Sequence, residues 1–243
     1  MQKRLNFFLS HLFVSILIAL LVVGIVFFIW YPSPLAIAVG VGQIFLMMLV
    51  IDVIVGPILS FLVYKENKPS LKFDLIVVFS VQLLALVYGL YSIGQGKPAW
   101  LVYNVDRFEL VRKNEVEKSY IAQVLPQYKY PSWFKPRYVA VELSKDAKTR
   151  NDDLFIELAG ISIAQRPERY LPLLQVKVQI QKRAQELDLL SQFNDKNLVK
   201  ATLAQYPQAN AFVPLKANSV DMTVLINKEQ GEVVKIVNLR PWK

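Results

Sequence analysis

Side chains that could act as nucleophiles, bases or metal ligands are scarce in this chain of 243 residues. Cysteine is absent, and the single histidine, His11, lies within an apolar run. This composition excludes thiolate chemistry, Ser-His-Asp triads and clusters of Cys or His metal ligands in the rest of the chain. The sequence also contains no glycine-rich phosphate loop and no nucleophile motif. We therefore expect no catalytic residue, no metal site and no cofactor.

One carboxylate is unusual because it lies inside an apolar run. Asp52 belongs to the stretch 36–63 and lies about 12 residues from its end, well inside the hydrocarbon of a membrane at about 1.5 Å per residue. Asp52, Gly56 and Ser60 recur at helical spacing and share one stripe, and Gln82 belongs to a similar stripe of the next apolar run. We expect these four residues to form a helix–helix contact site that binds a partner.

Three interpretations of Asp52 are open. In the first, a protonated Asp52 ties the helices of the chain together, with Gln82 or Ser15 within reach and Pro57 freeing the carbonyl of Val53 beside it. In the second, Asp52 receives a polar or cationic group from the helix of a partner. The third, proton conduction, is disfavoured because a pathway needs several ionisable groups in series.

Three apolar runs are long enough to cross a bilayer, which requires about 20 apolar residues. They extend over 7–30, 36–63 and 73–93. All five Lys and Arg of residues 1–96 lie at the amino terminus or in the second loop. The positive-inside rule then places the amino terminus in the cytoplasm and the chain after the third run on the opposite side. His11 is expected near the cytoplasmic surface.

Residues 97–243 are more polar and carry 23 basic and 16 acidic side chains, a net charge of +7. Branched and aromatic residues predict two strands around 104–106, one at 137–143, and a hairpin over 222–239. Helical patterns are found over 114–124, 151–162, 177–193 and 195–204. The sequence therefore predicts a membrane protein with three transmembrane α-helices (1–96) followed by a soluble α+β domain (97–243).

A segment that interleaves aromatic and basic side chains, residues 127–138, is a second candidate binding surface. Its candidate residues are Lys129, Trp133, Phe134, Lys135 and Arg137. Such a surface suits a membrane interface, a protein partner or a nucleic acid. The alternative is a surface loop whose rings complete the core. Because the segment is expected outside the cytoplasm, we expect the lipid bilayer or a protein, and no nucleic acid, as its partner.

The run from Trp30 to Lys65, which contains Asp52 and Gly56-Pro57, is followed by Lys72-Phe73-Asp74 and Asp106-Arg107-Phe108. Together these motifs resemble the TfpX/TfpZ family of type IV pilin accessory proteins. The resemblance implies a multi-pass protein of the bacterial inner membrane, with a cytoplasmic amino terminus and a periplasmic domain. It also implies the major type IV pilin, and other pilus assembly proteins, as partners. Pilins of this type wait in the inner membrane as a single helix with a charged amino end and an intramembrane glutamate.

The expected function is to bind pilin and to promote or regulate type IV pilus assembly without enzymatic activity. The alternative is a membrane sensor or regulatory protein whose periplasmic domain binds cell wall or another envelope protein. The short cytoplasmic segments disfavour this alternative. A membrane-embedded enzyme acting on pilin or lipid would need a nucleophile or a metal site, which the sequence does not offer.

Overall fold

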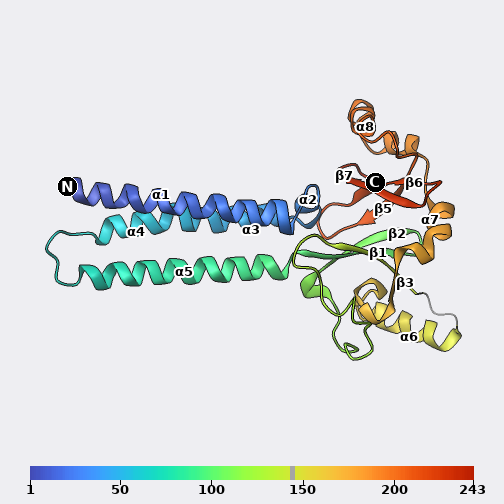
Figure 1. Ribbon diagram of the computed structural model, residues 1–243, viewed down its shortest axis with the longest axis horizontal. Coiled ribbons are helices and arrows are strands. Elements are labelled where there is room, and N and C mark those ends of the chain that lie inside the picture. The colour runs from blue at the N-terminus through green and yellow to red at the C-terminus, as the bar shows by residue number, and fades with distance from the viewer. Residues whose placement is uncertain (143–145) are drawn as a thin grey trace. The chain divides into compact units, whose positions relative to one another are not determined.

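The chain forms three long apolar helices followed by a mixed sheet with short helices, as the computed structural model shows (Figure 1). The structure describes residues 1–142 and 146–243, apart from the side chains of residues 148 and 149. This architecture confirms the predicted fold class. The chain divides into two compact units: a helical unit, Met1–Ala36 with Val41–Gly96, and a sheet unit, Ile37–Gly40 with Lys97–Lys243.

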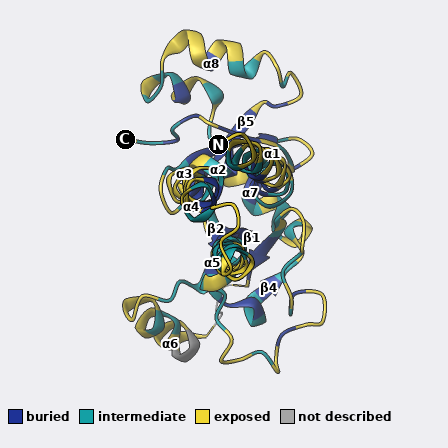
Figure 2. Ribbon diagram, turned by 90° about the vertical axis from the view of Figure 1, so that its left-hand side faces the viewer, coloured by how far each residue is buried: buried dark blue, intermediate teal, exposed yellow. Residues whose placement is uncertain are grey.

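Three helices are long and apolar enough to cross a membrane: Gln2–Trp30, Val41–Val63 and Leu71–Gln95. The first span consists of α1 (Gln2–Gly24) and the π-helical segment η1 (Ile25–Trp30), and the short α2 (Leu35–Val39) follows it. The second span consists of α3 (Val41–Val50), the π-helical segment η2 (Ile51–Val55) and α4 (Gly56–Val63), and the third is α5 (Leu71–Gln95). Most residues of these helices are exposed or half-buried (Figure 2), and many of the exposed ones are large and apolar. The chain is therefore a membrane protein.

The π-helical turn in the second span changes which carbonyl lacks a helical donor. The backbone N–H of Gly56 donates to the carbonyl of Ile51, five residues earlier. Pro57 has no N–H, so in this register the carbonyl left without its donor is that of Asp52. The expectation that Pro57 frees the carbonyl of Val53 is therefore wrong by one residue, because it assumed an α-helical register.

A seven-stranded mixed sheet with the order β4-β3-β1-β2-β5-β6-β7 organises the sheet unit. The strands are β1 (Pro98–Asn104), β2 (Arg107–Arg112), β3 (Arg137–Val141), β4 (Tyr170–Leu171), β5 (Ala211–Lys216), β6 (Met222–Asn227) and β7 (Glu232–Val237). β1 pairs with β3 and β2 with β5 in parallel, whereas the other neighbours are antiparallel. The strands predicted on both sides of 104–106, at 137–143 and in the C-terminal hairpin are confirmed, although residue 143 lies outside the described residues.

The α-helices of the sheet unit are α6 (Ala147–Leu158), α7 (Lys177–Arg183) and α8 (Lys196–Leu203). Short 3-10 turns connect the elements: η3 (Lys113–Glu115), η4 (Ile163–Gln165), η5 (Pro167–Arg169), η6 (Leu173–Val176) and η7 (Leu187–Gln192). The prediction of a helix capped by Asp195 is confirmed, because one carboxylate oxygen of Asp195 accepts from the backbone N–H groups of Asn197 and Leu198.

Two predicted helices differ in the structure, one because of a long-range hydrogen-bonded pair and the other because of local hydrogen bonds. The helix expected over 177–193 breaks after Arg183, because Gln185 forms two backbone hydrogen bonds of 2.8 and 2.9 Å with Phe212. The helix expected over 114–124, a stretch that the structure describes in full, does not form. Instead, Glu117 Oε1 accepts from the N–H groups of Lys118 and Ser119 at 2.8 Å and closes a local turn.

The segment Ile37–Gly40 joins the sheet unit although it lies between the first two spans in the sequence. The carbonyl of Ala38, which is fully buried, accepts from the N–H groups of Ser219 (2.9 Å) and Val220 (3.2 Å). Gly40 has a φ of +78°, and a Cβ atom there would lie 2.9 Å from Ser219 Oγ. Glycine is therefore required at this position both by the backbone conformation and by the close approach of Ser219.

We predict that Gly40→Ala weakens the attachment of this segment to the sheet unit. A left-handed conformation costs an L-residue roughly 1–2 kcal/mol, and the contact with Ser219 adds to that cost. Thermal unfolding of the purified full chain in mild detergent measures the effect. Gly42→Ala is the matched control, because nothing lies within 4 Å of a Cβ at Gly42 and its φ is not positive. Equal stability of the two variants would contradict the prediction.

Candidate functional site

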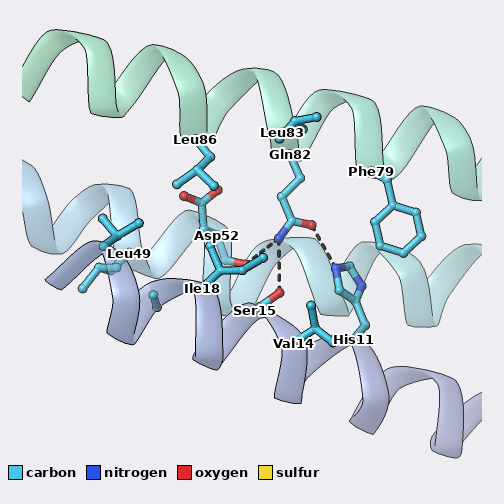
Figure 3. Close-up of a pocket in the computed structure, with 12 residues that line it drawn as sticks. His11, Val14, Ser15, Ile18, Leu49, Asp52, Phe79, Gln82, Leu83 and Leu86 are labelled. Atoms are coloured by element: carbon cyan, nitrogen blue, oxygen red, sulfur yellow. Dashed lines mark hydrogen bonds between the residues drawn. The ribbon is translucent and has the colours of Figure 1, made fainter. Parts of the chain in front are cut away.

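A hydrogen-bonded network centred on Gln82 of α5 connects the three spans (Figure 3). The Gln82 Nε2 group donates to the carbonyl of Asp52 at 2.8 Å and to Ser15 Oγ of α1 at 3.3 Å. Gln82 Oε1 lies 3.0 Å from His11 Nε2, and His11 Nδ1 lies 2.8 Å from Ser60 Oγ of α4. One side chain of α5 therefore holds both of the other spans.

The backbone sets the orientation of this network. A carbonyl can only accept, so the Gln82 amide must present its NH₂ group to Asp52 and its oxygen to His11. His11 must then carry a proton on Nε2 and donate it to Gln82. His11 is 7% exposed and its ring lies against Phe79. His11 therefore belongs to the packed interior of the helical unit, and its expected depth near the cytoplasmic surface stays a prediction.

Gly56 allows Gln82 to come close to the second span. A Cβ atom at Gly56 would overlap the amide group of Gln82. The stripe of Asp52, Gly56 and Ser60 is thus real, but Gly56 and Ser60 serve contacts within the chain, Gly56 with Gln82 and Ser60 with His11. Binding of a partner at these residues stays a prediction.

The Asp52 side chain is outside the network. Asp52 is 6% exposed, and neither carboxyl oxygen has a hydrogen-bond partner among the described residues. Figure 3 shows the carboxyl group turned away from the Gln82 amide and towards Leu86. The interpretation that a protonated Asp52 ties the three helices together through its carboxyl group is not supported by this geometry, because Gln82 makes that connection through the backbone carbonyl.

The carboxyl group lines a cavity of about 260 Å³ between α1 and α5. Both helices pack against the second span, whereas their backbones scarcely approach each other. The walls are apolar and include Ile18 and Val22 of α1 and Leu83 and Leu86 of α5. Asp52 lies eleven residues from each end of the second span, Val41–Val63, and therefore at mid-membrane depth. We refer to this feature as the Asp52 cleft.

The second candidate surface is also exposed in part. Trp133 and Phe134 are 75% and 66% exposed, so the interpretation in which all rings of this segment complete the core is wrong for them. It holds for Tyr128, which is buried against Trp100. Arg137 is exposed, and its guanidinium group donates to the backbone carbonyls of Gln127 and Tyr130. Lys129 is half-buried and Lys135 is exposed.

Lys97 is a residue of this surface that sequence reasoning missed. Its ammonium group donates to the carbonyls of Ser132 (2.9 Å) and Trp133 (2.7 Å), and the residue is 4% exposed. Burial, and to a lesser extent the charge of Lys113, lowers the pKa of Lys97 to about 8, so the group is still mainly protonated at neutral pH. Lys97 and Ser132 are 35 positions apart in the sequence, so no local sequence pattern predicts their contact.

Neither the Asp52 cleft nor the aromatic and basic segment 127–138 has a cluster of metal ligands among the described residues. Within residues 1–142 and 146–243, no group of three or more His, Cys, Asp or Glu side chains could hold a metal ion. The Asp52 cleft offers one carboxyl group in an apolar surround, which suits recognition of a hydrogen-bond donor. The fold and this site together describe a membrane protein of three spans with an apolar cleft at mid-membrane depth that contains one carboxyl group.

Comparison with known proteins identifies the family. The family model described as "Fimbrial assembly protein FimB" matches residues 1–40. Three curated proteins of Dichelobacter nodosus are similar. The fimbrial assembly protein of serogroup E1 is 30% identical over 230 residues, covering 91% of this chain and 90% of the relative, and that of serogroup I is 27% identical over 231 residues, with the same coverage. The protein of serogroups C1 and C2 is 31% identical over 108 residues, 44% of this chain and 82% of the relative. No solved structure matches the chain.

The chain therefore belongs to the family of fimbrial assembly proteins. The similarity to the serogroup E1 protein extends over nearly the whole length of both chains, so it includes the three spans and the sheet unit. The predicted resemblance is confirmed at the level of fimbrial assembly. The narrower TfpX/TfpZ assignment stays a prediction.

We predict that Gly56→Ala loosens the three spans. The added Cβ forces the Gln82 amide away from Asp52, Ser15 and His11, and each hydrogen bond between membrane helices contributes about 0.6–2 kcal/mol. We expect the free energy of unfolding in mild detergent to fall by about 1–3 kcal/mol.

The control for this variant is Gly24→Ala, because nothing lies within 4 Å of a Cβ at Gly24 in the first span. A double-mutant cycle with Gln82→Ala tests the cause, because alanine lacks both the amide group and the Cδ atom that a Cβ at Gly56 would meet. Once the amide is gone, Gly56→Ala should cost little more, so the two effects should not add. Additive effects would show that Gly56 acts through something other than Gln82.

Proposed function

We propose that this protein is a non-enzymatic accessory protein of the bacterial inner membrane that binds the major type IV pilin and promotes or regulates pilus assembly. Membership of the fimbrial assembly family supports the assembly role. The absence of cysteine and the use of the only histidine in a structural hydrogen-bond network support binding over catalysis.

In the proposed topology the amino terminus is cytoplasmic and residues 97–243 form a periplasmic domain. The distribution of Lys and Arg supports the orientation. The sheet unit adds an independent argument, since it contains Ile37–Gly40 as well as Lys97–Lys243. The segments that follow the first and the third span must then be on the same side of the membrane, as three crossings require.

The observation that carries the proposed function is the unpartnered carboxyl group of Asp52 in its cleft. An ionisable side chain at mid-membrane costs about 3 kcal/mol, which nothing in the described residues offsets through a hydrogen bond. A partner that supplies a donor within the bilayer would offset this cost. A transmembrane helix seated between α1 and α5 is placed to do so, because the cleft opens between these two helices and its walls are apolar.

A pilin helix has the properties that the Asp52 cleft requires. The intramembrane glutamate implied for this class of pilin would, when protonated, donate a hydrogen bond to the Asp52 carboxyl group. Apolar residues of the same helix would pack against Ile18 and Leu86. Binding would keep the pilin subunit in the membrane in a defined orientation before assembly.

We predict that Asp52→Leu abolishes most surface piliation without destabilising the protein. Because the carboxyl group makes no hydrogen bond within the described chain, its removal costs no internal contact and raises the free energy of unfolding by about 1–3 kcal/mol. Surface pili and total pilin are measured in cells that express the variant at the level of the natural chain.

The matched control is Gln43→Leu, which removes an exposed polar side chain from the same span outside the cleft. It should leave piliation unchanged. Normal piliation with Asp52→Leu would overturn the proposed role of the cleft. Degradation of the Asp52→Leu protein would show instead that Asp52 stabilises the chain itself.

A further inference from the structure

A loop of the sheet unit exposes several aromatic rings, three of them within residues 130–134. In residues 118–136, here the aromatic loop, Tyr130, Trp133 and Phe134 are 72%, 75% and 66% exposed. Exposed rings of this size are uncommon on a surface that faces only water. Tyr and Trp are the residues that concentrate where hydrocarbon meets lipid head groups.

The aromatic loop and the strand β3 that follows it carry charge of one sign. Residues 118–141 contain four basic side chains, Lys118, Lys129, Lys135 and Arg137, and no acidic side chain. Arg137 binds the loop backbone, whereas Lys118 and Lys135 are exposed and Lys129 is half-buried. A surface that combines exposed rings with lysines is complementary to a bilayer that contains anionic lipids.

The backbone of the loop is fixed from within. Lys97 binds the carbonyls of Ser132 and Trp133, and Arg137 binds those of Gln127 and Tyr130. Arg137 also stacks on Trp100 at 4.5 Å from the ring centroid. These contacts bind the backbone of the loop and leave its rings exposed. The exposure of the rings therefore follows from how the loop backbone is held.

The chain itself brings this loop to the membrane surface. Lys97 is two residues beyond Gln95, the last residue of α5, so it lies within about 7 Å of the end of the third span in any arrangement of the two units. Because Lys97 is hydrogen-bonded to Ser132 and Trp133, the exposed rings are tethered near the point where the span leaves the bilayer.

From this tether, the exposed rings and the charge, we propose that the aromatic loop is a membrane-interface foot. Tyr130, Trp133 and Phe134 insert between the head groups of the bilayer that the spans cross, and Lys129 and Lys135 contact anionic lipids. The foot fixes the height and tilt of the sheet unit above the membrane. This inference does not depend on the proposed binding of pilin.

The absence of cysteine makes a direct test possible, because a single introduced cysteine is a unique labelling site. The full chain with Phe134→Cys is labelled with a polarity-sensitive fluorophore and placed in nanodiscs that contain phosphatidylcholine and phosphatidylglycerol. We expect emission at shorter wavelength than in a water-exposed position, and loss of most of the fluorescence when the lipids carry bromine near the head groups. Leu174→Cys, 73% exposed in the same unit, is the control and should show neither effect.

Four outcomes are distinguishable. Labels at 134 and 174 that behave alike in brominated nanodiscs would overturn the proposal. Protection of position 134 only after another envelope protein is added would identify a protein-binding loop and would also overturn it. In the supporting outcome, quenching at position 134 is stronger with anionic lipid than with phosphatidylcholine alone, and the pair Lys129→Gln and Lys135→Gln removes this difference. Quenching at position 134 that is the same with and without anionic lipid, and unchanged by Lys129→Gln and Lys135→Gln, would overturn the proposed contact of the lysines with anionic lipids.

Discussion

The helical unit depends on a backbone carbonyl that its own helix leaves without a donor. The π-helical turn at Ile51–Val55 and the missing N–H of Pro57 together deprive the Asp52 carbonyl of a helical hydrogen bond. In hydrocarbon such a group must find another donor. Gln82 provides it, and the rest of the Gln82 amide then fixes Ser15 and His11 of the first span. One irregular turn thus determines how the three spans pack.

The same interaction explains why Asp52 is available to a partner. Its main chain binds Gln82 while its side chain, turned towards Leu86, lines an apolar cleft and has no hydrogen-bond partner in the described chain. A partner helix would therefore add a contact without disrupting the network. Under the proposed function, the main chain of Asp52 serves the stability of the helical unit and its side chain serves binding of a partner, so substitutions at Gly56 and at Asp52 are expected to have different consequences.

The spans, the buried position of Asp52 and the C-terminal hairpin could be predicted from the sequence, because apolar run length and alternation are local signals. The π register could not, since no local pattern of residue types distinguishes a π-helical turn from an α-helical one. β5 could not be predicted, because Pro214 lies inside it and proline removes a strand donor. Proline is tolerated there because β2 pairs with β5 only at Leu215 and Lys216, so no hydrogen bond to β2 is lost at position 214. The contact of Lys97 with Trp133 and that of Gln185 with Phe212 are long-range, and no local pattern encodes them.

The central claim, that a pilin helix occupies the Asp52 cleft, is tested most directly by site-specific photocrosslinking in cells that express the natural pilin. A photoreactive residue replaces Ile18 or Leu86 in the cleft wall, or Leu46 or Leu84 on outward faces of the second and third spans. The account predicts a pilin adduct from positions 18 and 86 that is absent or much weaker from positions 46 and 84. No adduct from the cleft, or equal adducts from both sets of positions, would contradict it.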